Sequence, residues 1–129
     1  MRNRFDRQLD LLNEKLTAMG AMCEESIALV AKALSNGDLT LAEKVRSESE
    51  TIDGMEREIE NRCMKLLLHQ QPVAKDLRQI SAALKMITDM ERIGVQTRDI
   101  AEIIIFLKGQ SVSGVAIIED MARATIKMV

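Results

Sequence analysis

The stretch His69-Gln70-Gln71-Pro72 separates two long runs of periodic apolar residues and decides how the chain folds back on itself. Apolar residues recur every three or four positions on both sides of it, as on the buried face of a helix. These residues are Leu41, Val45, Ile52, Met55, Ile59, Cys63 and Leu66 before it, and Leu77, Ile80, Leu84, Ile87, Met90 and Ile104 after it. Proline ends a helix or opens one in its first turn. The sequence therefore predicts two antiparallel helices, over 39–68 and from Pro72 to about Leu107.

A third helix is predicted before this pair, over residues 5–34. Its apolar positions are Leu9, Leu12, Leu16, Met19, Cys23, Ile27, Val30 and Leu34. Asn36-Gly37-Asp38 follows, in which Gly37 suits the residue after a helix end and Asp38 suits an N-cap. Within the helix over 39–68, Gly54 is expected to mark a close contact between helices. Three long helices with short connections predict an all-α fold, an antiparallel three-helix bundle over residues 1–108.

The remaining residues, 109–129, are predicted to be a linker and the start of a further helix. Lys108 to Ser111 form a loop, and Val115, Ile118, Ala122, Ile126 and Val129 follow at helical spacing. The segment ends on Val129 without a C-cap, so we expect more structure to follow it.

Composition limits the classes of function. The chain has 129 residues, 47% of them hydrophobic, which is enough for one domain with a core. Its net charge is −2, no basic patch stands out in the sequence, and Tyr and Trp are absent, which argues against nucleic-acid binding. Without a signal peptide or a Cys-x-x-Cys motif, we expect a cytoplasmic protein whose Cys23 and Cys63 are reduced and packed in the core.

Two carboxylates, Asp53 and Glu91, are predicted to lie at the same height on facing helices. Asp53 precedes Gln71 by eighteen residues and Glu91 follows Pro72 by nineteen, so both lie roughly 27 Å from the turn. Such a pair suits a divalent cation such as Mg²⁺ or Ca²⁺, or iron as in di-iron bundles. The other interpretation is a solvated acidic stripe, which is usual on helix flanks and has Lys44, Arg57, Arg92 and Arg98 nearby for weak surface pairs. The residues alone leave both interpretations open.

The sequence gives little support to an enzyme. No nucleophile lies beside a base, no Gly-rich phosphate loop is present, and the single histidine, His69, suits the C-terminal turn of a helix. We therefore expect a protein that acts by binding.

Two specific motifs resemble the PhoU family of phosphate-uptake regulators. They are Gln71-Pro72-Val73-Ala74-Lys75-Asp76-Leu77-Arg78 and Asp89-Met90-Glu91-Arg92-Ile93-Gly94, supported by Arg4-Phe5, Met19-Gly20, Asn36-Gly37-Asp38 and Ile52-Asp53-Gly54-Met55-Glu56. The resemblance covers about residues 4–108 and restarts near Val112. It implies tandem three-helix repeats, of which this chain holds the first and, in 109–129, the incomplete first helix of the second.

The family's metal-binding pattern pairs an acidic residue with an Asp four positions later, on facing helices. In this chain Ser49 and Val95 replace two of the expected carboxylates. The resemblance thus implies metal ligands at Asp53, Glu91 and Asp99, with a divalent cation or iron as the cofactor.

The resemblance also implies a function and partners. Members of the family resemble non-enzymatic adaptors between the ATPase subunit of a phosphate ABC transporter and a sensor histidine kinase, and they repress the starvation response when phosphate is plentiful. A cytoplasmic homodimer at the membrane periphery would follow from this. A metal-binding bundle and a scaffold that regulates another transporter are the alternatives.

Overall fold

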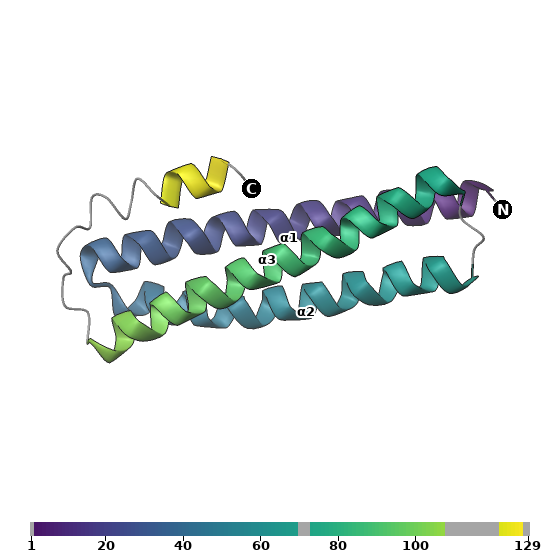
Figure 1. Ribbon diagram of the computed structural model, residues 1–129. Coiled ribbons are helices and arrows are strands. Elements are labelled where there is room, and N and C mark those ends of the chain that lie inside the picture. The colour runs from purple at the N-terminus through teal and green to yellow at the C-terminus, as the bar shows by residue number, and fades with distance from the viewer. Residues whose placement is uncertain (1, 70–72, 108–121, 128–129) are drawn as a thin grey trace.

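Three long helices account for most of the computed structural model, which describes residues 2–69, 73–107 and 122–127. They are α1 (Arg2–Asn36), α2 (Leu39–His69) and α3 (Ala74–Phe106). Figure 1 shows them side by side, each running opposite to the one before it in the chain. This confirms the predicted all-α bundle. Pro72, the loop at 108–111 and residues 112–121 lie outside the described part, so the division of the chain at residue 108 stays a prediction.

The connection between α1 and α2 forms as the sequence predicts. Gly37 has a φ of 64°, a left-handed conformation that glycine adopts without strain. The backbone N–H of Asp38 donates to the carbonyl of Ala33 at 3.0 Å. Oδ1 of Asp38 accepts a hydrogen bond from the N–H of Leu41 at 3.1 Å, so this side chain caps α2.

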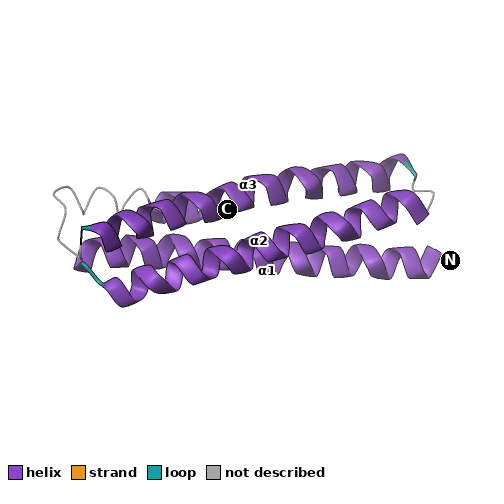
Figure 2. Ribbon diagram, turned by 90° about the horizontal axis from the view of Figure 1, so that it is seen from below, coloured by secondary structure: helices purple, strands orange, loops and turns teal. Residues whose placement is uncertain are grey.

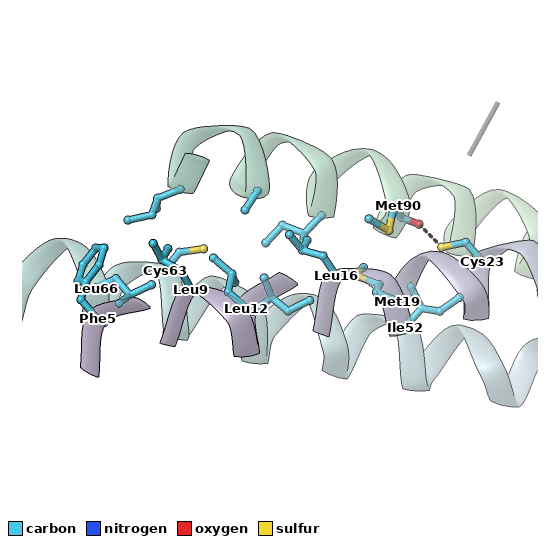
Figure 3. Packing of buried hydrophobic residues seen from close by; sticks show 14 residues of the cluster. Phe5, Leu9, Leu12, Leu16, Met19, Cys23, Ile52, Cys63, Leu66 and Met90 are labelled. Carbon is cyan, nitrogen blue, oxygen red and sulfur yellow. Dashed lines mark hydrogen bonds between the residues drawn. The ribbon is translucent and has the colours of Figure 1, made fainter. Parts of the chain in front are cut away.

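The core consists largely of the apolar residues predicted from the period. Leu77 is an exception: it was predicted on the inner face of its helix but is 42% exposed, because it lies in the first turn of α3 at the end of the bundle. The larger cluster of the core runs from Phe5 along α1 to Cys23 and is closed by residues of α2 and α3 (Figure 3). A smaller cluster around Val30, Val45 and Ile104 closes the other end. Both cysteines are fully buried, as predicted. The Sγ of Cys23 lies 3.4 Å from the carbonyl oxygen of Met90, to which it donates (Figure 3).

Residues 122–127 form a short helix beside the bundle, within the segment predicted to start a further helix. Ala122 and Thr125 line a groove of about 330 Å³. The other lining residues come from α1 and α3, and include Ile27, Val30 and Ile100. None of the helices in the described ranges is long and apolar enough to cross a membrane.

Candidate functional site

The acidic stripe between α2 and α3 is positioned by a close contact between these helices. A β-carbon added to Gly94 would lie 3.0 Å from Cγ2 of Ile52, so a larger residue at position 94 has no free space. The expectation that Gly54 fills this role was wrong, because a β-carbon there would meet nothing within 4 Å. Gly54 lies two residues beyond Ile52, about 200° around the helix, and therefore points elsewhere.

The contact sets the register of the two predicted carboxylates. The register predicted by counting residues from the turn places Ile52 opposite position 92. In the structure Ile52 lies against Gly94, so the predicted register is off by two residues. Asp53 and Glu91 each act electrostatically on Glu56, so each lies within electrostatic range of that carboxyl. The centre of the stripe is thus Glu56, one turn of α2 after Asp53.

The charge of Glu56 is disfavoured by its surroundings. Burial is the largest cause that raises the pKa of this carboxyl above its ordinary value of 4.5. Neighbouring negative charge raises the pKa further, in the order Glu60, Glu91 and Asp53, while Arg57 opposes it. The spacing of three and four residues among Asp53, Glu56 and Glu60 was visible in the sequence, but it does not show whose pKa is raised.

Asp53 carries a buried oxygen that lacks a hydrogen-bond donor. Its Oδ1 has no partner among the described residues. A buried acceptor without a donor costs about 1–3 kcal/mol. A cation, a proton or a donor from another molecule would each satisfy this oxygen.

Asp99 lies apart from this group. It is eight residues beyond Glu91 on α3, about 12 Å along the helix axis. Its exposed carboxylate lies 3.7 Å from the guanidinium of the neighbouring Arg98. Asp53 and Glu91 are thus each linked electrostatically to Glu56, and Asp99 is not among the groups that act on it.

Ser49 and Val95 occupy the two positions where the family pattern has a carboxylate, and neither supplies one. Ser49 is buried, and its hydroxyl donates to the carbonyl of Arg46 at 3.0 Å. Val95 is half-buried and apolar. Within the described ranges, no group of three or more His, Cys, Asp or Glu side chains is arranged to hold a metal ion. As they stand, these side chains do not form a metal cluster, and metal binding at Asp53, Glu91 and Asp99 stays a prediction.

A second acidic cluster, which sequence reasoning missed, lies between α1 and α2. Glu48 is buried, and its Oε2 accepts a hydrogen bond from the Ser26 hydroxyl at 3.1 Å. Its Oε1 has no hydrogen-bond partner among the described residues. Burial, and then the charge of Glu25, raise the pKa of the Glu48 carboxyl. The sequence does not predict this cluster, because a glutamate next to Ser49 belongs to no apolar pattern that would indicate its burial.

Comparison with known proteins identifies the fold. The family model described as the PhoU domain matches residues 16–104. Phosphate-specific transport system accessory protein PhoU homologues from Clostridium acetobutylicum and Pseudomonas aeruginosa are 40% and 34% identical to this chain. These matches cover 82% and 97% of the chain, but 49% and 52% of the relatives, so the chain spans about half the length of the curated relatives it matches.

A solved structure agrees with the sequence comparisons. The crystal structure of PhoU from Pseudomonas aeruginosa superposes with a TM-score of 0.90 at 33% identity, over 96% of this chain and 60% of that one. The family match includes the greater part of α1, all of α2 and α3 as far as Ile104. The chain therefore belongs to the PhoU domain family.

Proposed function

We propose that this protein is a non-enzymatic regulator of phosphate uptake and of phosphate-starvation signalling. The observation that carries the proposal is the match of the three-helix bundle to the PhoU domain family and to a PhoU crystal structure. Relatives of this chain are named as accessory proteins of a phosphate-specific transport system. The proposal extends that accessory role to this chain.

In the proposed mechanism, the protein links the ATPase subunit of a phosphate ABC transporter to a sensor histidine kinase. It acts in the cytoplasm as a homodimer at the membrane periphery. A regulator of this kind shifts the kinase equilibrium only by binding one kinase state more tightly than the other. The long helix faces supply such a surface, and exposed methionines such as Met64 and Met86 adapt to different partners.

The experiment is deletion of the gene and measurement of phosphatase output in phosphate-rich medium. Derepression that a copy of the intact gene reverses supports the regulatory role. Unchanged output in a host without a second relative contradicts it and favours a scaffold for another transporter.

A second candidate is binding of a divalent cation or iron at the acidic stripe. The partnerless Oδ1 of Asp53, beside Glu56 and Glu91, favours it because a cation would satisfy this oxygen and relieve the repulsion. The double substitution Asp53→Ala and Glu91→Ala should abolish metal uptake measured by equilibrium dialysis. Repression that survives this substitution would separate the adaptor role from metal binding.

A further inference from the structure

One end of the bundle gathers positive charge from three segments that are distant in the sequence. The start of α1, the end of α2 and the start of α3 lie together there, as Figures 1 and 2 show from two sides. Over residues 4–10, 61–68 and 73–80 the sequence has six Lys or Arg against three Asp, whereas the whole chain has a net charge of −2. The six are Arg4, Arg7, Arg62, Lys65, Lys75 and Arg78. One of the three acids, Asp76, is buried. This end, here called the basic end, is cationic on a bundle that is otherwise acidic.

The basic end also exposes large apolar side chains. Leu68, next to last in α2, is 74% exposed, and Val73, which precedes α3, is 57% exposed. Met64 and Leu77, one turn further from the end on each helix, are also exposed. These exposed side chains lie in the last turns of α2, just before α3 and in the first turn of α3.

A small recess at the basic end is lined by cations and by no carboxylate. Gln8 and Leu11 of α1 and Arg62, Lys65 and Leu66 of α2 enclose about 180 Å³. Nε of Arg62 is buried and has no hydrogen-bond partner among the described residues. Its terminal nitrogen pairs with the exposed Glu58 at 3.3 Å. The cationic lining of the recess, Arg62 and Lys65, suits an anion.

We propose that the basic end binds the surface of a membrane that contains anionic lipids. Leu68 and Val73 enter the boundary between headgroups and acyl chains, and the surrounding Lys and Arg side chains bind lipid phosphates. Arg62 and Lys65 take a headgroup phosphate in the recess. The inference rests on the proposed place of the protein at the membrane periphery and names the surface responsible.

Charge and shape favour a lipid surface over an acidic protein. Exposed apolar side chains at the same end as several long cations fit a soft, flat, anionic interface. The opposite end of the bundle serves as the contrast. It exposes Ile103 and Phe106 as well, but the groove there is lined by Glu43, Glu50 and Glu102 together with Arg46 and Arg98. Apolar exposure is thus common to both ends, whereas an excess of positive charge is found at the basic end.

Sedimentation of the purified chain with vesicles tests the proposal. The protein should bind vesicles of phosphatidylcholine mixed with phosphatidylglycerol and leave pure phosphatidylcholine vesicles unbound. Each Lys or Arg near an anionic surface contributes about fivefold in affinity, so the triple variant Lys65→Gln, Lys75→Gln, Arg78→Gln should bind about a hundredfold more weakly. Raising the salt from about 0.1 M to about 0.5 M should release the wild type as well.

The chain offers matched controls. Lys32, Lys85 and Arg92 are exposed and lie away from the basic end, so replacing all three with Gln removes the same charge and should leave binding unchanged. Leu68→Ser with Val73→Ser should weaken binding about tenfold through lost apolar insertion. Val73 precedes α3 without a side-chain cap, so a serine there favours the helix, and circular dichroism should show an intact fold.

The outcomes separate this inference from the proposed function. Equal binding to neutral vesicles, or a triple variant that binds like the wild type, overturns the lipid surface. Absence of vesicle binding overturns it too, and loss of phosphatase repression by the same variant would then assign the basic end to an acidic protein partner. Vesicle binding by a protein whose deletion leaves phosphatase output unchanged supports the lipid surface and contradicts the regulatory function.

Discussion

Replacing Gly94 with Ala tests the packing that positions the acidic stripe. The added β-carbon would lie 3.0 Å from Cγ2 of Ile52 and 3.4 Å from its Cβ and Cδ1. Ile52 is fully buried, and a β-branched side chain in a helix has one strongly preferred rotamer, so it cannot turn away. The two helices must therefore separate by a few tenths of an ångström.

Two opposing terms decide the magnitude. Alanine in a helix interior is favoured over glycine by about 1 kcal/mol. Overpacking a filled core costs about 1–3 kcal/mol. Gly94→Ala should therefore lower the free energy of unfolding by up to about 2 kcal/mol, or the melting temperature by about 4 °C for each kcal/mol.

The matched control is Gly54→Ala on α2. No atom lies within 4 Å of its added β-carbon, so only the helix propensity acts and the variant should gain about 1 kcal/mol. Urea unfolding followed by circular dichroism measures both variants. In an Ile52→Ala background the cost of Gly94→Ala should disappear, because the opposing Cγ2 is gone. If Gly94→Ala stabilises the protein as much as Gly54→Ala does, the close contact is not where the structure has it.

The remaining predictions concern buried ionisable groups and the core. The Glu48 carboxyl titrates near pH 4.5 in the unfolded chain, and folding raises its pKa. The free energy of unfolding should therefore fall as the pH rises through the folded pKa. Glu48→Gln should remove this slope in urea unfolding at several pH values and gain about 1–2 kcal/mol at pH 7; an unchanged slope would contradict the burial of the charge. Glu56→Gln should act in the same direction by less than about 1 kcal/mol, because its carboxyl is only half-buried and its repulsion is partly solvated. Burial raises the pKa of the Cys23 thiol to about 11, so iodoacetamide should alkylate it only after unfolding, and rapid labelling of the native protein would refute its enclosure. Leu12→Ala should cost about 3–5 kcal/mol in thermal unfolding, since this side chain is fully buried; a loss below about 1 kcal/mol would mean that the site collapses around the cavity.

The helices were predictable because local signals and periodicity agree along most of the chain. Gly37 and Asp38 adopt the cap geometry that their residue types predict. Helix ends moved by only a few residues, from Phe5 to Arg2 and from Leu34 to Asn36 on α1. Terminal turns carry few apolar contacts, so the period gives weak information there.

The details of the site were less predictable because they depend on register and burial. Counting residues from the turn predicted Asp53 opposite Glu91, in a register two residues from the observed one, and did not predict the role of Glu56. The close contact between α2 and α3 is made at Gly94 and not at Gly54. Which glycine faces the other helix depends on how each helix is rotated about its axis, and the sequence does not show this rotation.

The basic end also could not be predicted from the sequence alone. No basic patch stands out along the sequence, because the cations come from three separate segments, among them Arg7, Lys65 and Lys75. Only the antiparallel arrangement of the helices gathers them (Figure 1). Surface properties of this kind follow from the fold and not from any single stretch of residues.

The most direct test of the regulatory role is phosphatase activity in phosphate-rich medium after deletion of the gene. We expect derepressed activity that returns to its repressed level when the intact gene is supplied. Activity that stays repressed in a deletion strain lacking any second relative would contradict the proposed function.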